Sequence, residues 1–376
     1  MSTNVVNEKL ASITALGTSI WLDQIGRHLI EGGELQRLVD EFSLRGVTSN
    51  PAIFEQAIVK SDDYDAEIAE MAAEGLSPLE IYGRIAVKDV KLAAQVLRPV
   101  WDQAGGADGF VSLEVAPALA RDKTGKTLAE ARYYWNEVSC PNLMIKIPGT
   151  PEGLDAIEEA IYEGININVT LLFAVERYAA VAEAYIRGLE RRHAEGKSLD
   201  VHSVASFFVS RVDTLVDKQL AEAGRADLSG RAAVANARAA YAKFKEIFHG
   251  ERFAALREAG AFVQRPLWAS TGTKNPEYSD VLYVDTLVGP ETVNTMPMKT
   301  LIAASLESEV STVTLDEDPT PVLDELAAAG IDMNAVTEQL LDEGIDAFVH
   351  SLDGLIADIE QQLAASGGSP PSEQPG

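Results

Sequence analysis

Short segments of strand character alternate with helical segments along nearly the whole chain, and this alternation restricts the fold more than any other feature of the sequence. The strand-like segments are apolar and most of them lead into a polar, glycine or proline residue. Strands that are separated by helices usually pair in parallel. The pattern therefore predicts an α/β fold on a parallel sheet. Eight strands are expected, at residues 18–23, 44–48, 109–115, 142–150, 165–170, 201–209, 261–269 and 292–296.

Helical periodicity fills the intervals between these strands. We expect Thr150 to cap one helix, with Pro151 at its first position. Residues 280–288 fit a strand or a buried helix, and we favour the helix. The expected helices are 5–16, 33–42, 61–73, 77–100, 128–138, 150–162, 174–194, 231–259 and 280–288, with further helices after residue 321.

Eight strand–helix units are the number that closes a (β/α)8 TIM-type barrel. The long connections after the second, sixth and eighth strands are then insertions that carry extra helices. A chain of 376 residues also allows two ordinary domains. We interpret residues 1–366 as a single barrel domain with additional helices, and residues 367–376, which are rich in Pro, Ser and Gly, as a disordered tail.

Charge and cysteine content restrict the partners and the compartment. The chain has 31 Lys and Arg residues against 58 Asp and Glu residues, a net charge of −27, which argues against nucleic acid as a partner. Cys140 is the only cysteine, so no intrachain disulfide can form, and no apolar run is long enough for a membrane span. We expect a cytoplasmic protein that binds neither nucleic acid nor membrane. No pattern in the sequence assigns an oligomeric state.

Lys146 lies inside the apolar strand at 142–150. A core strand normally excludes lysine, because removing an ammonium from water without a partner costs several kcal/mol. Burial favours the neutral amine, which is a nucleophile that can form a Schiff base with a carbonyl. Two interpretations are open from this strand alone: an edge strand with Lys146 in solvent, or a buried nucleophile.

Polar residues follow the ends of several predicted strands. In a barrel these ends meet at one face, where active sites of this architecture lie. A single polar residue in such a place is most often a helix cap or a satisfied core group. Together they supply the acid and base that a desolvated lysine needs to move protons. The set is Asp23, Asn50, Glu114, Lys146, Asn168, Thr170, Ser206, Arg211, Ser270 and Lys274.

Seven blocks of this sequence, in order, resemble the transaldolase family, in its longer bacterial and plant-like branch. The resemblance extends over nearly the whole chain up to the tail. The blocks are IWLDQ at 20–24, GVTSNPAIF at 46–54, VSLE at 111–114, MIKIPG at 144–149, INVTL at 167–171, SFFVSR at 206–211 and LWASTGTKN at 267–275.

The resemblance implies a TIM barrel and an enzyme of the pentose-phosphate pathway. Such an enzyme transfers a dihydroxyacetone unit from sedoheptulose 7-phosphate to glyceraldehyde 3-phosphate, and so yields erythrose 4-phosphate and fructose 6-phosphate. The partners are thus sugar phosphates. The resemblance implies no metal and no organic cofactor.

The same resemblance assigns the catalytic residues by position. Lys146 would form the Schiff base with the ketose carbonyl. Asp23 would take the proton from the hydroxyl whose carbon leaves as an aldehyde. Glu114 and Thr170 would hold the water that shuttles protons while the imine forms and breaks down.

The substrate-binding residues follow in the same way. Asn50, Asn168 and Ser206 would bind the hydroxyls of the three-carbon unit, and we include Phe208 among the substrate-binding residues.

Arg211, Ser270 and Lys274 would bind the phosphate. The best-known branch has a shorter block after the seventh strand, with arginine where this chain has Lys274. In the longer loop, Arg265 or a backbone N–H is the alternative phosphate ligand.

Two other functions compete with this interpretation. A lysine-dependent fructose 6-phosphate aldolase would share the fold, but by resemblance it has glutamine in place of Glu114 and tyrosine in place of Phe208. A non-catalytic barrel that binds sugar phosphates would need neither Lys146 nor its acid. Both Lys146 and Asp23 are present, so we expect a transaldolase.

Overall fold

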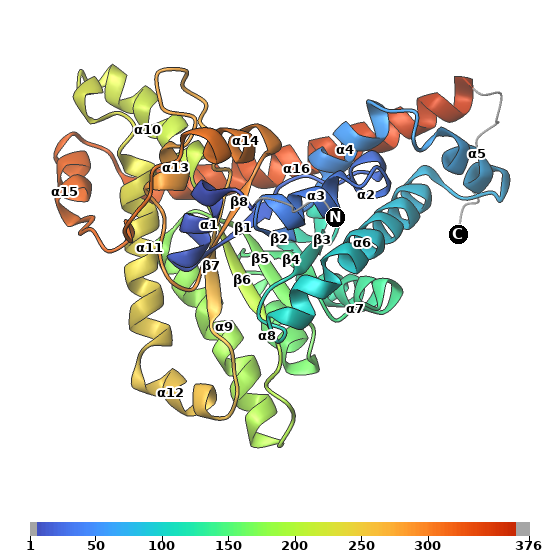
Figure 1. The fold of residues 1–376 in the computed structure, drawn as a ribbon, viewed down its shortest axis with the longest axis horizontal. Helices are drawn as coiled ribbons and strands as arrows, with labels where there is room; N and C mark the ends of the chain where they lie inside the picture. Colours follow the sequence, from blue (N-terminus) through green and yellow to red (C-terminus); the bar gives the residue numbers. More distant parts are fainter. Residues whose placement is uncertain (1–5, 366–376) are drawn as a thin grey trace.

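The computed structural model describes residues 6–365 and contains a closed barrel of parallel strands (Figure 1). Each strand pairs with the next along the chain, and the last pairs with the first. The predicted (β/α)8 fold is therefore confirmed. The strands are β1 (Thr18–Leu22), β2 (Leu44–Val47), β3 (Phe110–Glu114), β4 (Leu143–Pro148), β5 (Ile167–Leu172), β6 (Ser203–Phe208), β7 (Gln264–Ala269) and β8 (Thr292–Met296).

Helices surround the barrel and also cover one of its ends. Among the helices of residues 6–365, none combines the length and apolar character that crossing a membrane requires. The helices are α1 (Glu8–Ala15), α2 (Arg27–Glu31), α3 (Glu34–Glu41), α4 (Pro51–Val59), α5 (Asp65–Ala73), α6 (Pro78–Gln103), α7 (Lys126–Val138), α8 (Leu154–Glu163), α9 (Val175–Ala194), α10 (Ser210–Glu222), α11 (Ala232–Phe248), α12 (Glu251–Glu258), α13 (Leu282–Asp285), α14 (Met298–Glu307), α15 (Thr320–Ala328) and α16 (Met333–Ala365), with short 3₁₀ helices η1 (Pro117–Arg121) and η2 (Ala226–Leu228).

Three helix predictions need correction. Thr150 does not cap α8: its hydroxyl accepts a hydrogen bond from the Gly153 amide at 3.1 Å, which closes a turn, and α8 begins only at Leu154. The helix expected at 231–259 is two helices, because the backbone is extended at Gly250, between α11 and α12. Only a single turn of the helix expected at 280–288 forms, as α13.

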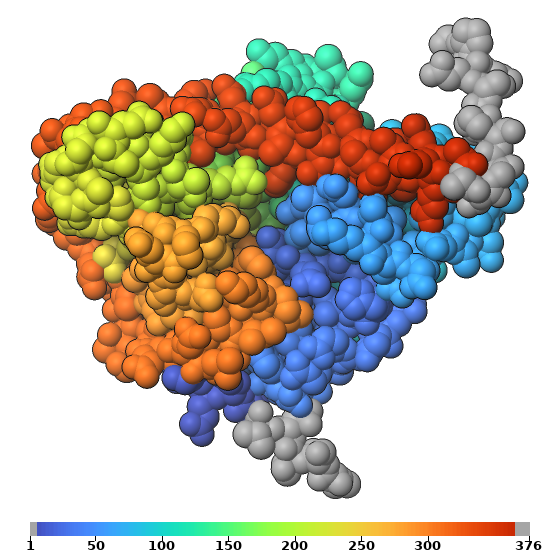
Figure 2. All heavy atoms as spheres, turned by 90° about the horizontal axis from the view of Figure 1, so that it is seen from above, coloured from blue at the N-terminus to red at the C-terminus, as the bar shows by residue number. Residues whose placement is uncertain are grey.

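The insertions lie where the sequence predicted them. Helices α4 to α6 follow β2, helices α10 to α12 follow β6, and helices α14 to α16 follow β8. The long helix α16 lies across one end of the barrel, next to α4 and α10 (Figures 1 and 2). The tail predicted at 367–376 lies outside the described residues.

Strand register brings polar side chains from neighbouring strands together. Glu114 on β3 is opposite Lys146 on β4, and Lys146 is in turn opposite Asn168 on β5. Two residues further along, Pro148 is opposite Thr170. These residues lie in the C-terminal parts of their strands, so the barrel gathers them near one end.

Candidate active site

A cavity of about 160 Å³ opens at the C-terminal ends of the strands. It contains most of the residues that the sequence predicted for the site, together with some that it did not. The lining residues are Asp23, Thr48, Asn50, Ala52, Lys146, Thr170, Ser206, Phe208, Arg211, Ala269, Ser270, Gly272, Lys274, Thr295, Pro297 and Phe348.

Lys146 is buried, with only 4% of its surface exposed. Its strand β4 lies between β3 and β5 in a closed barrel, so the alternative of a solvent-facing edge strand is wrong. The amine Nζ donates a hydrogen bond to the Ser49 carbonyl at 3.1 Å and lies 3.4 Å from Oε2 of Glu114. Lys146 is thus a desolvated amine with one close acid.

Glu114 packs against Lys146 and is itself buried. Burial raises the pKa of Glu114 to about 7, an effect that the charge of Lys146 opposes and the charge of Asp23 reinforces. A carboxyl group with this pKa can accept or donate a proton near neutral pH. The buried hydroxyl of Thr170, also predicted for the site, makes no hydrogen bond to any residue in the described part of the chain. Its hydrogen-bonding capacity is therefore available to a ligand in the cavity.

Asp23 follows the end of β1, where its amide donates to the Met296 carbonyl of β8 at 2.8 Å. Burial raises the pKa of Asp23, while the charge of Lys146 and a hydrogen bond from Thr48 lower it. The Thr48 hydroxyl donates to Oδ1 of Asp23 at 2.6 Å, so the 2.7 Å contact between the Thr48 and Thr295 hydroxyls leaves Thr295 as the donor. The two threonines orient the carboxylate beside the cavity.

Thr48 and Thr295 were missed as functional candidates. Thr48 belongs to the block at 46–54 and could have been found there, whereas Thr295 lies in β8, a strand that none of the seven blocks includes.

Three buried side chains form a hydrogen-bonded row across β3, β5 and β6. Ser206 donates to Oδ1 of Asn168 at 2.7 Å, and Nδ2 of Asn168 donates to the Ser112 hydroxyl at 3.0 Å. Ser206 lines the cavity, while Asn168 supports it from behind.

Asn50 caps α4, because its Oδ1 accepts from the Ile53 amide at 3.0 Å. The amide nitrogen of Asn50 is therefore the group that can donate to a ligand.

The cavity also carries two basic side chains, Arg211 and Lys274. Arg211, near the start of α10, is half-buried, and burial lowers its pKa. Its guanidinium makes no hydrogen bond or ion pair with a residue in the described range 6–365. Lys274 is exposed and lines the same cavity. Ser270, which also lines the cavity, has a left-handed backbone conformation with φ of 56°, and its hydroxyl is 2.8 Å from that of Ser210.

Arg265 cannot replace Lys274 in this cavity. It is near the start of β7, where Nη1 donates to the Ser19 hydroxyl at 3.1 Å and Nη2 lies 3.4 Å from Oδ1 of Asp108. A strand rises about 3.3 Å per residue, so the length of β7 separates Arg265 from Ser270. The alternative of Arg265 as a phosphate ligand is therefore wrong.

Helix α16 contributes a residue that the sequence did not predict for the site. The buried ring of Phe348 lines the cavity, with its centroid 6.0 Å from Nζ of Lys146. Phe348 also lies 6.5 Å from Phe208, which in turn packs against Phe173 at 5.3 Å. One wall of the cavity is thus aromatic.

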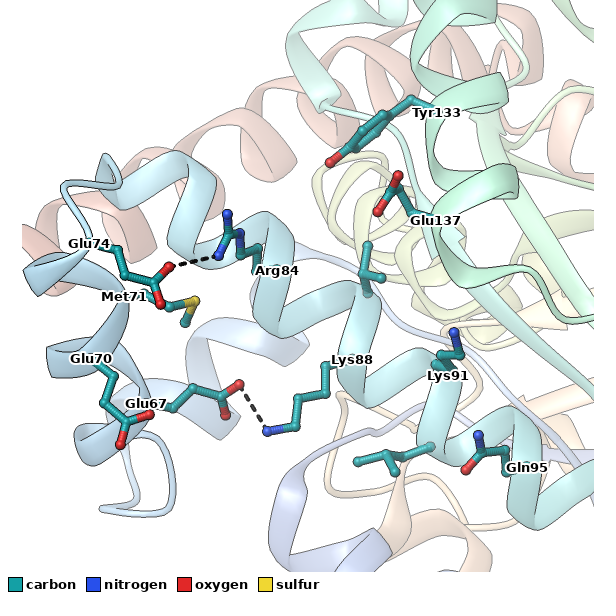
Figure 3. Close-up of a pocket in the computed structure, with 12 residues that line it drawn as sticks. Glu67, Glu70, Met71, Glu74, Arg84, Lys88, Lys91, Gln95, Tyr133 and Glu137 are labelled. Atoms are coloured by element: carbon teal, nitrogen blue, oxygen red, sulfur yellow. Dashed lines mark hydrogen bonds and ion pairs between the residues drawn. The ribbon is translucent and has the colours of Figure 1, made fainter.

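A larger hollow, of about 610 Å³, lies between α5, α6 and α7 (Figure 3). It contains none of the predicted site residues. Ion pairs join Arg84 to Glu74 at 3.1 Å and Lys88 to Glu67 at 2.9 Å, so both of these basic side chains on its walls already have an acidic partner. Within residues 6–365 no group of three or more His, Cys, Asp or Glu side chains could hold a metal ion. The cavity around Lys146 is therefore the better candidate for catalysis.

Comparisons with known proteins point to the same family as the resemblance seen in the sequence. The family model "Transaldolase/Fructose-6-phosphate aldolase" matches residues 20–359. The transaldolase of Thermobifida fusca is 48% identical over 363 residues, which cover 95% of this chain and 98% of that protein. The transaldolase of Mycolicibacterium paratuberculosis is 48% identical over 368 residues, and that of Mycobacterium marinum 47% over 367 residues; each alignment covers 96% of this chain and 98% of the relative.

Proposed function

Because the chain belongs to the transaldolase/fructose-6-phosphate aldolase family, we propose that it is a transaldolase that transfers dihydroxyacetone from sedoheptulose 7-phosphate to glyceraldehyde 3-phosphate. The observation that carries this proposal is the buried amine of Lys146, 3.4 Å from Glu114, in a cavity that also contains Asp23. A Schiff-base aldol reaction requires a nucleophile, a proton acceptor beside it and a second acid–base group. Lys146, Glu114 and Asp23 supply these three groups in that order.

Imine formation begins with a proton transfer. Lys146 loses a proton to Glu114 and attacks the ketose carbonyl, which gives a carbinolamine. Loss of water from that adduct needs a proton donor close to its hydroxyl, and Glu114 returns the proton through a water held with Thr170. The pKa of Glu114, about 7, suits both directions of this transfer.

Cleavage follows from the imine, which draws electrons from the bond to be broken. Asp23 removes the proton from the hydroxyl on the carbon that will leave as the aldehyde, which is two carbons from the imine carbon; the bond between that carbon and the intervening one breaks, and an aldose phosphate leaves. The bond's electron pair becomes the enamine on Lys146. The acceptor aldehyde then enters, the enamine carbon attacks its carbonyl, and Asp23 returns the proton to the new hydroxyl.

Substrate binding uses the remaining groups. Asn50 and Ser206 bind hydroxyls of the three-carbon unit, and Asn168, which lies behind the cavity wall, orients Ser206 through their 2.7 Å hydrogen bond. Arg211 and Lys274, with Ser270, bind the phosphate, and they supply local positive charge in a protein whose net charge is −27. Salt screens the distant acidic surface, whereas these groups act at contact distance.

We propose a cytoplasmic location, which the substrates and the single cysteine, Cys140, favour.

The decisive test is a comparison of transfer with release. With fructose 6-phosphate as donor and erythrose 4-phosphate as acceptor, the protein should form sedoheptulose 7-phosphate faster than it releases free dihydroxyacetone. Release that dominates even with acceptor present would identify an aldolase, and binding without turnover would identify a non-catalytic barrel. Asp23→Ala should still form the imine but cleave it slowly, because Asp23 acts after Lys146.

A further inference from the structure

The C-terminal helix α16 brings an aromatic ring over the reactive amine. Phe348 is 4% exposed and lies with its ring centroid 6.0 Å from Nζ of Lys146. Together with Phe208, whose ring centroid is 6.5 Å away, it forms a continuous apolar wall of the cavity. The ring comes from outside the eight strand–helix units and covers the catalytic strand β4.

A close backbone approach fixes the position of this ring. Gly344 lies one helical turn before Phe348, and a Cβ atom there would lie 3.0 Å from Cδ2 of Leu171 and 3.5 Å from Nη1 of Arg211. Glycine thus allows α16 to lie against the end of β5. An ion pair between Arg121 of η1 and Asp342 ties the same part of α16 to the barrel.

The buried face of α16 is consistent with a docked helix. Leu341, Ile345 and Phe348 recur at helical spacing and are between 4% and 8% exposed. The same face of α16 therefore lies beside Arg211 at Gly344 and beside the amine of Lys146 at Phe348.

We propose that Phe348 determines the fate of the lysine-bound dihydroxyacetone intermediate, by excluding water from Lys146 so that the intermediate is transferred and not released. This inference rests on the proposed function. It names a specificity residue for the reaction, with no direct part in proton transfer.

The reaction that competes with transfer is hydrolysis of the intermediate bound to Lys146. After cleavage the enamine on Lys146 can take at carbon the proton that Asp23 removed from the departing hydroxyl, which gives the imine of dihydroxyacetone. Water then adds to the imine carbon, the carbinolamine loses the amine, and free dihydroxyacetone leaves with Lys146 restored. The water consumed equals the water released when the imine first formed. Only the water step depends on solvent reaching the imine carbon beside Lys146, and the apolar ring occupies that side of the cavity.

The test compares Phe348→Ala and Phe348→Leu with wild type. The measured quantity is the ratio of free dihydroxyacetone to transfer product, with fructose 6-phosphate as donor and erythrose 4-phosphate as acceptor. We expect the ratio to rise about tenfold in Phe348→Ala, because the deleted ring admits water, and to rise less in Phe348→Leu, which keeps an apolar side chain there. Borohydride trapping of the lysine adduct should remain in both variants.

Leu355→Ala is the matched control. Leu355 is on the same helix and fully buried, but it does not line the cavity. Its truncation loosens α16 without opening the wall beside Lys146, and the ratio should stay at the wild-type value. Thermal unfolding of each variant reports whether the fold is retained.

Two results would overturn the inference: an unchanged ratio in Phe348→Ala and Phe348→Leu, or an equal rise in Leu355→Ala, which would assign the effect to a loosened helix. Failure of the proposed function is a separate outcome, since the wild-type protein would then form no transfer product at all.

Discussion

Replacement of Glu114 by glutamine tests the proton transfer that begins the reaction. The substitution keeps the size of the side chain 3.4 Å from Nζ of Lys146 but removes its ability to accept a proton. A positioned general base contributes about 10²- to 10⁴-fold in rate. At 1.36 kcal/mol per factor of ten, this is about 3–5 kcal/mol of barrier. Glu114→Gln should therefore form the imine slower by that factor, while long incubation still yields the adduct.

The pH dependence gives the sharper readout. Glu114 must be ionised to accept the proton, so the wild-type rate of imine formation should rise as pH passes through about 7 and level off above it. Glu114→Gln has no such group, and its rate should show no inflection in that window. The assay is single-turnover quenching with borohydride over a range of pH centred on 7.

An inflection near 7 that persists in Glu114→Gln would refute the assignment of the base. Asp23→Asn is the control, because it removes a different carboxyl group that acts only after the imine has formed. It should keep an inflection in the imine step, at a somewhat lower pH because the charge of Asp23 helps to raise the pKa of Glu114, while slowing cleavage.

The same pKa affects stability. The folded-state pKa of Glu114, about 7, lies above its ordinary value of 4.5. Its contribution to the free energy of unfolding is therefore complete below about 4.5 and is lost as pH rises through about 7. Denaturant unfolding of wild type and Glu114→Gln at about pH 4.5 and again above pH 7 should show a smaller loss of stability in the variant, and an equal loss would contradict the raised pKa.

Three further substitutions test other parts of the site and its support. Thr48→Val removes the 2.6 Å hydrogen bond to Asp23. Because a hydrogen bond to a charged group is worth about 1.5–3 kcal/mol, cleavage should slow by roughly 10- to 150-fold while the imine can still be trapped. Loss of trapping would argue against the role of Thr48. Arg211→Ala should raise KM for fructose 6-phosphate much more than for unphosphorylated fructose; an equal rise would exclude Arg211 as a phosphate ligand. Arg27→Ala breaks a buried 2.8 Å ion pair with Asp89. Denaturant unfolding should show a loss of stability of about 3–5 kcal/mol, because the carboxylate is left buried without its partner. A loss below about 1 kcal/mol would show that the pair contributes little.

The barrel and the centre of the site were predictable because their signals are local. Apolar strands that lead into polar residues recur along the chain, and parallel closure of the barrel brings their C-terminal ends together. Lys146, Glu114 and Asn168 belong to three consecutive strands, and their register in the structure makes them neighbours. No long-range contact had to be known to group them.

The rest of the site depends on contacts between distant segments. Phe348 follows Lys146 by about two hundred residues in the sequence. Its spacing from the other apolar residues of its helix is the same as that of any core-facing residue, so it does not mark Phe348 as part of the site. Thr295 supports Thr48 only because β8 closes the barrel against β1. Contacts of this kind leave no recognisable pattern in a single sequence.

The error on Arg265 has a different cause. Its residue type suited a phosphate, but its position in the strand did not. Because Arg265 precedes the end of β7 by four residues, it points its charge into the opposite end of the barrel, where it pairs with Asp108. The position of a residue along its strand therefore decides at which end of the barrel its side chain lies, whatever the charge of that side chain.

The central claim is that Lys146 is the nucleophile, and covalent trapping tests it most directly. Wild-type protein treated with fructose 6-phosphate and borohydride should gain the mass of a reduced three- or six-carbon adduct, and peptide mapping should locate it on Lys146. Lys146→Ala should gain none. An adduct of undiminished yield in Lys146→Ala, or one mapped to another lysine in the wild-type protein, would contradict the account.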